Sequence, residues 1–114
     1  MRFRLQTRQT RSFIVHTVPL TLLTIIGEGL LRERLITEIE RAGAKGYTIT
    51  ECSGSGSRHR RVGELLGENM KLECVVSPEV ADKLLGILSD EYFPHFAVIA
   101  YLSPVSVIRG DKYV

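Results

Sequence analysis

Short apolar runs alternate with amphipathic stretches along the first half of the chain. The run LTLLTII at residues 20–26 is rich in β-branched residues and bounded by Pro19 and Gly27, which is typical of a central strand. Over residues 28–42, apolar side chains recur every three or four positions with charged residues between them. This spacing predicts an amphipathic helix, and Gly43 suits its C-terminal end.

Three further segments have the pattern of strands. Residues 47–52, YTITEC, are rich in strand formers, and residues 70–76, MKLECVV, alternate before becoming wholly apolar. Residues 96–102, FAVIAYL, have the composition of a last central strand. We expect Pro104 to interrupt this strand and residues 105–108 to form a separate short edge strand.

The clearest local signal is the start of a second helix at Ser77, Pro78 and Glu79. A serine can cap a helix, proline suits its first position, and glutamate favours its positive end. Apolar residues then follow at helical spacing: Ala81, Leu84, Leu85 and Leu88.

The predicted order of elements is β-α-β-loop-β-α-β. It indicates an α+β fold, the ferredoxin-like βαββαβ sandwich, with a four-stranded antiparallel sheet and both helices on one face. We assign this domain to residues 18–114 and place a flexible loop at about residues 54–68. Residues 1–17 form a basic N-terminal extension, either an added edge strand or an arm.

The net charge of +2 hides a separation of charge along the 114 residues. Seven arginines lie in two segments, residues 1–11 and 54–61, which contain none of the 13 acidic residues. The rest of the chain is therefore acidic. Positive charge placed in this way favours an anionic ligand or partner, although arginines at exposed ends and loops can also be merely solvated.

Two other patterns exclude classes of protein. Cys52 and Cys74 make no disulfide framework and fit no zinc spacing, which favours a reducing compartment. Residues 12–27 carry no Asp, Glu, Lys or Arg, yet they are too few to span a bilayer and contain His16 and Pro19. A buried strand explains them better than a signal sequence or membrane helix.

The loop combines glycines, serines and arginines in the run GSGSRHRR at residues 54–61. Glycines let backbone N–H groups approach an anion, and arginine grips phosphate oxygens with paired, charge-assisted hydrogen bonds. The loop is therefore a candidate phosphate cradle. It is not a P-loop, and a loop that is only mobile and soluble would have a similar composition.

Several stretches together resemble the PII signal-transduction superfamily, in the branch tied to bicarbonate uptake and carboxysomes. They are AGAKGYT at 42–48, GSGSRHRR at 54–61, NMKLECVV at 69–76, EYF at 91–93 and AYLSPVSVIRG at 100–110. The loop matches the G-x-G-S-R-x-x-R loop base of these proteins. The resemblance runs from about residue 20 to the end of the chain.

The resemblance implies a homotrimer with adenine nucleotides (ADP or AMP, with ATP and cyclic AMP as further candidates) bound in clefts between subunits. The backbone around Glu73 and Val75 would face the adenine, and Arg109 would reach a neighbouring subunit's phosphate. The residues implied to hold phosphates are Gly54, Gly56, Ser57, Arg58 and Arg61.

The resemblance also implies a regulatory protein that does not catalyse and needs no cofactor or metal. Bicarbonate is implied as a second ligand, and a bicarbonate transporter or another carbon-metabolism protein as a partner that the loop docks on or leaves. The implied location is the cytoplasm, with peripheral membrane association through a transporter partner. No catalytic constellation is visible in the sequence, which agrees with this implication.

Departures from the nitrogen-sensing PII proteins favour the carbon branch. The loop has no tyrosine that could be uridylylated, and the only glutamines are Gln6 and Gln9, so the glutamine that binds 2-oxoglutarate is missing. The alternative function is that of an RNA-binding ferredoxin-like domain that uses the arginine-rich loop. The strand at residues 70–76 lacks the aromatic residues on which bases would stack, so no nucleic acid is expected.

Overall fold

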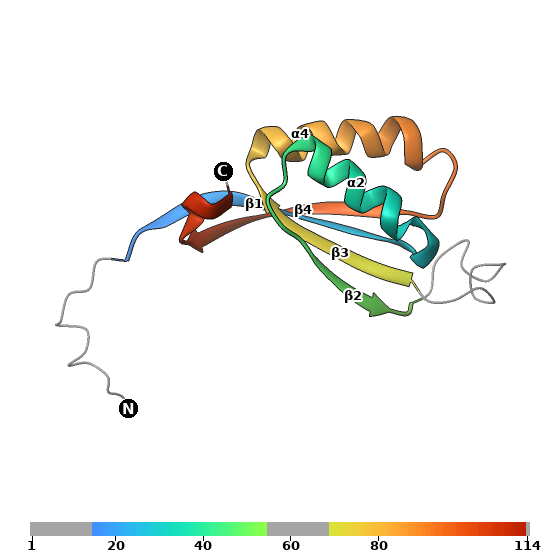
Figure 1. The fold of residues 1–114 in the computed structure, drawn as a ribbon, viewed down its shortest axis with the longest axis horizontal. Helices are drawn as coiled ribbons and strands as arrows, with labels where there is room; N and C mark the ends of the chain where they lie inside the picture. Colours follow the sequence, from blue (N-terminus) through green and yellow to red (C-terminus); the bar gives the residue numbers. More distant parts are fainter. Residues whose placement is uncertain (1–14, 55–68, 114) are drawn as a thin grey trace, which may run out of the picture.

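The computed structural model describes residues 15–54 and 69–113 as a sheet with helices on one side of it (Figure 1). The sheet has four antiparallel strands in the order β2-β3-β1-β4. The elements are β1 (Thr17–Glu28), α2 (Arg32–Ala42), β2 (Thr48–Cys52), β3 (Asn69–Val76), α4 (Pro78–Ile87) and β4 (Ile99–Ile108). Short helical turns flank them: η1 (Gly29–Leu31), η2 (Leu88–Tyr92) and η3 (Gly110–Tyr113). The predicted α+β ferredoxin-like sandwich is confirmed.

Strand alternation decides which face of the sheet the helices cover. Leu23 and Ile25 of β1 are fully buried, and so is Leu72 of β3, which pairs with Ile25. Successive side chains of a strand point to opposite faces, so the helix-covered face collects the apolar set. The apolar stripes of both helices, continued into the turns η1 and η2, complete this core with Leu31, Leu35, Ile39, Ala81, Leu84 and Leu88. Within residues 15–54 and 69–113, no further layer covers the opposite face, which we call the open face (Figure 1).

The helix boundaries follow from their end residues. Ser77 accepts a hydrogen bond from the backbone N–H of Val80 at 3.2 Å, and Pro78 occupies the first turn, as predicted. Helix α2 ends at Gly43, whose φ of 114° lies in the left-handed region that glycine tolerates. The Nζ of Lys83 donates to the carbonyl oxygen of Ala42 at 3.3 Å, which ties α4 to the C-terminal end of α2.

Two predicted strand ends at prolines are wrong. Strand β4 continues through Pro104, which pairs with Thr21, so residues 105–108 are no separate strand. Strand β1 likewise includes Pro19, which pairs with Ser106. Each proline has one side without a neighbouring strand: β4 lies at the sheet edge, and β3 pairs with β1 only from residue 21 onward. The N–H that each proline lacks would have pointed to this side, so its absence removes no hydrogen bond between paired strands.

Replacing Ser77 by alanine is expected to lower the free energy of unfolding by about 1 kcal/mol, because the N–H of Val80 loses its capping oxygen. Urea denaturation followed by circular dichroism at fixed protein concentration measures this change. Ser89→Ala, at an exposed position of η2, is the control and should change the free energy by less than about 0.5 kcal/mol. Equal losses in the two variants would contradict the capping role.

Candidate functional site

The candidate loop leaves and re-enters the sheet between two adjacent strand ends. Cys52, the last residue of β2, pairs with Asn69, the first residue of β3. Gly54 follows Cys52 closely and is exposed, and no atom of the described residues lies within 4 Å of the place where its Cβ would stand. A ligand can therefore approach its backbone closely. The other predicted phosphate-holding residues, Gly56, Ser57, Arg58 and Arg61, lie outside the described residues.

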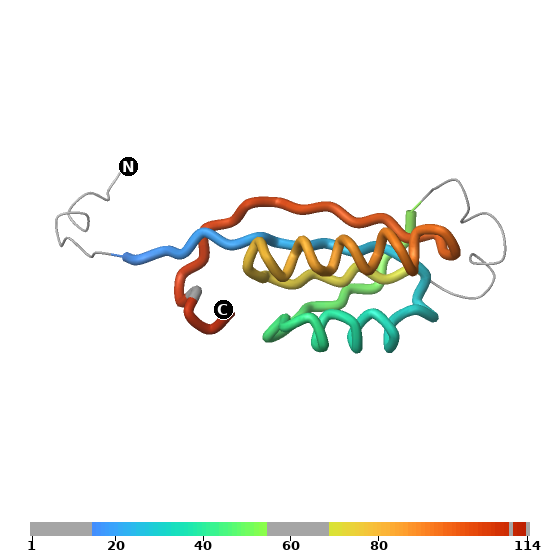
Figure 2. Tube along the Cα trace, turned by 90° about the horizontal axis from the view of Figure 1, so that it is seen from above, coloured from blue at the N-terminus to red at the C-terminus, as the bar shows by residue number. Residues whose placement is uncertain are grey.

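The same end of the sheet carries the connection between α4 and β4. Glu28, the last residue of β1, pairs with Asn69, and Ile26 pairs with Ile99 at the start of β4. The backbone N–H of Ala97 lies 3.5 Å from Oε2 of Glu28. The loop base and the turn at residues 93–98 are thus neighbours, which we call the loop end of the sheet (Figure 2).

Glu73 and Val75, the predicted adenine neighbours, lie on the open face of β3 and are half-buried. Thr24 of β1 pairs with Glu73 on one side and with Tyr101 of β4 on the other. Paired residues share a face, so a carboxylate, a hydroxyl and a phenol form one row across the open face. Thr24 is 1% exposed, while Tyr101 is 47% exposed.

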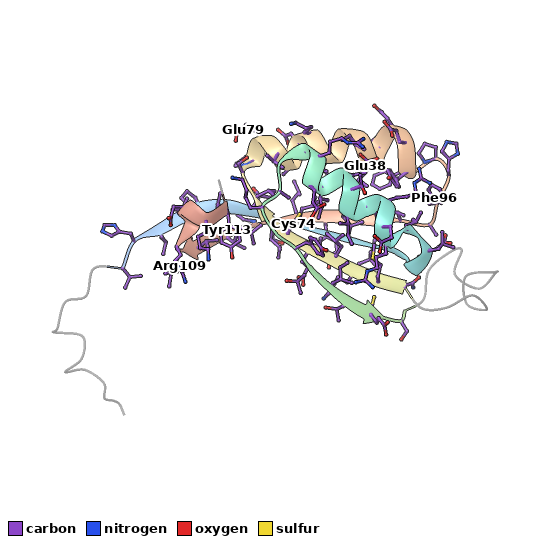
Figure 3. The ribbon with its side chains drawn as sticks, in the orientation of Figure 1. Glu38, Cys74, Glu79, Phe96, Arg109 and Tyr113 are labelled. Atoms are coloured by element: carbon purple, nitrogen blue, oxygen red, sulfur yellow. The ribbon has the colours of Figure 1, made fainter. Side chains whose placement is uncertain are left out.

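Arg109 lies at the end of the sheet opposite the loop end (Figure 3). Strands β1 and β4 stay paired from Ile26 and Ile99 to Thr17 and Ile108, roughly 30 Å at the usual rise of a strand. Within one chain, Arg109 and Gly54 therefore do not meet. Arg109 is exposed and has a φ of 66°, a left-handed conformation that is unusual for a residue with a Cβ.

A cluster that the sequence did not suggest joins α2 to the end of η2. The guanidinium carbon of Arg34 lies 5.1 Å from the ring centre of Tyr92 and 5.2 Å from that of Phe96. The hydroxyl of Tyr92 donates to Oε2 of Glu38 at 3.0 Å. Burial, and then this hydrogen bond to a carboxylate, raise the pKa of Tyr92. The only sequence signal was the pairing of Arg34 and Glu38 on one side of a helix.

The two cysteines lie on opposite faces of the sheet. Cys74 belongs to the core and is 2% exposed, and burial raises the pKa of its thiol to about 11. Cys52 is half-buried and pairs with Asn69, which places it on the open face. The thiol of Cys74 is thus a small apolar group of the core.

Residues 15–54 and 69–113 contain no group of three His, Cys, Asp or Glu side chains that could hold a metal ion. Over the same residues, no helix is long and apolar enough to cross a membrane.

Comparison with known proteins places the chain in a family. Residues 20–112 match the family "Nitrogen regulatory protein P-II". A candidate PII-like signalling protein from Thermus thermophilus has 55% sequence identity and a TM-score of 0.77, over 87% of this chain and 99% of that one.

Structures of the PII-like protein CPII from Thiomonas intermedia are also similar. The CPII structure with ADP and bicarbonate has 29% identity and a TM-score of 0.78, over 89% of this chain and 100% of that one. The CPII structure with ADP, AMP and acetate has 29% identity and a TM-score of 0.77, over 87% and 98% of the two chains. The family match covers most of the chain and agrees with the fold and the strand order, so this chain belongs to the nitrogen regulatory protein P-II family.

Proposed function

We propose that this PII-like regulatory protein binds adenine nucleotides between the subunits of a homotrimer and signals through the segment at residues 54–68. ADP and AMP are the first candidates, followed by ATP and cyclic AMP. The protein acts by binding, without catalysis. The domain comprises residues 18–114, and residues 1–17 are an extension to it.

The observation that carries this proposal is the separation of two sets of candidate residues. Gly54 lies at the loop end of the sheet and Arg109 at the opposite end, roughly 30 Å away along the paired strands. A single phosphate group cannot contact both in one chain. A second copy that supplies its own Arg109 to the loop end resolves this separation.

The open face supports self-association. It presents half-buried Leu22, Ile26 and Val75 in the middle of the sheet. Along the edge strand β4 it continues into Ile99, 58% exposed, and Tyr101, 47% exposed. Sheets are stable when both of their faces are covered or one face is polar, and this face is partly apolar. Packing the open faces of several copies together removes this apolar surface from water.

The ligand class is supported by the loop and by the relatives. The run GSGSRHRR has the glycines and arginines that a phosphate needs, with Gly56, Ser57, Arg58 and Arg61 as the proposed contacts beside Gly54. On the open face, the backbone of Glu73 and Val75 would contact the adenine. CPII, 29% identical, is bound to ADP and bicarbonate in one structure.

We further propose a role in inorganic carbon metabolism, in the context of carboxysomes and carbon concentration. Bicarbonate is then a second ligand, and the partner is a bicarbonate transporter or another carbon-metabolism protein. The protein would work in the cytoplasm and reach the membrane only through such a partner. The support is the resemblance of the loop and of β3 to the carbon branch, together with the bicarbonate in the CPII structure.

RNA binding is not favoured by the open face. RNA-recognition sheets stack bases on aromatic side chains of their central strands. On the two central strands here, the open face carries aliphatic and polar residues instead: Leu20, Leu22, Thr24, Ile26, Asn69, Lys71, Glu73 and Val75.

Calorimetric titration with ADP, AMP, ATP and cyclic AMP tests the proposed ligand. At least one nucleotide should bind, and Arg58→Ala should weaken that binding by more than about 1 kcal/mol, because a charge-assisted phosphate contact is lost. Arg41→Ala, at an exposed position in the last turn of α2, removes the same charge elsewhere and should leave affinity unchanged. Absence of binding to all four nucleotides, together with a salt-dependent gel shift of single-stranded RNA, would favour the alternative.

Complementation between two variants tests whether the site is shared between copies. Arg58→Ala and Arg109→Ala should each weaken nucleotide binding in their own trimers. Co-expression with two different tags, followed by tandem purification, yields mixed trimers, and each of these should regain one tight site. The regained site combines the intact loop of one subunit with the intact Arg109 of the next.

The backbone at position 109 supplies a control for this experiment. Arg109→Gly should weaken nucleotide binding as much as Arg109→Ala does. It should nevertheless unfold at a higher denaturant concentration than Arg109→Ala, because glycine accepts the observed φ of 66° without strain. Mixed trimers that bind no better than the parents would contradict a site built from two copies.

A further inference from the structure

One side chain of α2 covers two aromatic rings of the segment before β4. The guanidinium carbon of Arg34 lies 5.1 Å from the ring centre of Tyr92 and 5.2 Å from that of Phe96. The two rings are 5.9 Å apart and tilted by 42°. Arginine suits such a contact better than lysine, because its guanidinium is planar and weakly hydrated, whereas the ammonium group of lysine is compact and strongly hydrated.

A second contact fixes the same tyrosine to the same helix. Tyr92 is 1% exposed, and its hydroxyl donates to Oε2 of Glu38 at 3.0 Å. Arg34 and Glu38 are one turn apart on α2, so the helix holds Tyr92 at two points. Figure 3 shows Glu38 and Phe96 on the elements that this cluster joins.

The turn at residues 93–98 begins at this tyrosine. The carbonyl oxygen of Tyr92 accepts hydrogen bonds from the backbone N–H groups of His95 at 3.0 Å and Phe96 at 2.9 Å. The next N–H, that of Ala97, points to Oε2 of Glu28 at 3.5 Å. These hydrogen bonds connect the start of the turn to Tyr92 and its residue Ala97 to the end of β1.

The end of β1 connects the turn to the loop base. Glu28 pairs with Asn69, where the chain re-enters the sheet after the loop. Val98 lies directly over Gly27, since a Cβ at Gly27 would stand only 3.0 Å from Cγ2 of Val98. The end of the turn at Val98 is therefore packed closely against the end of β1, and Arg34 contacts the other end of the segment at Tyr92 and Phe96.

We propose that Arg34 is a positioning residue for the ligand site at the loop end. By stacking on Tyr92 and Phe96, it holds the turn at residues 93–98 against Glu28, and so fixes one wall beside the loop base without touching the ligand. The inference rests on the proposed nucleotide function, since it concerns the same site.

The test compares the wild-type trimer with Arg34→Ala, Arg34→Lys and Arg32→Ala. Arg32→Ala is the matched control, because it removes the same charge from an exposed position at the start of α2. Two quantities are measured for each: the ADP dissociation constant by calorimetry, and hydrogen exchange of the amides from residue 93 to residue 98 by mass spectrometry.

Arg34→Ala should bind ADP about twofold to fivefold more weakly, the loss expected for one exposed cation–π contact. Its amides at His95 and Phe96 should exchange faster, while amides of β3 stay unchanged. Arg34→Lys should resemble Arg34→Ala, since it keeps the charge and loses the planar stack. Arg32→Ala should behave as wild type.

Three results would overturn the inference. Arg34→Ala could bind ADP more weakly with unchanged hydrogen exchange in the turn, or exchange faster with unchanged affinity. Arg34→Lys could have the affinity and the exchange of the wild type. The last would mean that a positive charge at position 34 is sufficient and that the planar guanidinium is not needed. Failure of the proposed function is distinguishable, because there the wild-type protein itself binds no adenine nucleotide.

Discussion

The register of β1 between β3 and β4 is the constraint on which the rest of the structure depends. Glu28 pairs with Asn69, and Ile26 pairs with Ile99, so the loop base and the turn before β4 meet at one end. The same register puts Leu23 and Ile25 under the helices. A shift by one residue would turn these buried side chains to the open face, so the core strongly specifies the register.

The same alternation gives the sheet two different faces, one covered by the helices and the other the open face. On the covered face, helices α2 and α4 bury Leu72 and Val76 of β3 almost completely. On the open face, Glu73 and Val75 of the same strand are half-buried. On the proposed function, a ligand bound where this face meets a second copy would act on two things at once: the contact between copies and the segment at residues 54–68. Ordering of a segment by a ligand is a common way in which proteins switch, and the shared location explains how binding alone could signal.

Local patterns in the sequence predicted most of the fold. Alternation placed β3, helical spacing placed α2, and Ser77 marked the start of α4. The errors fell at Pro19 and Pro104, because whether a proline breaks a strand depends on its neighbours across the sheet. The Arg34 cluster was not predicted for a similar reason. Tyr92 and Glu38 are 54 residues apart, and nothing in an arginine or an aromatic residue shows in advance that they will stack.

For the site, the sequence could name residue types but could not place them. Arg109 was expected to reach the phosphate of another subunit, and the structure sets it roughly 30 Å from the loop base along the paired strands. Its left-handed φ of 66° costs about 1–2 kcal/mol in a residue with a Cβ, and Gly110 follows directly. The positive φ therefore falls on the arginine, although a glycine, which would adopt it without strain, lies one position away. On the proposed function, an arginine so far from its own loop base serves a neighbouring copy, and the open face of the sheet is the surface on which that copy would pack.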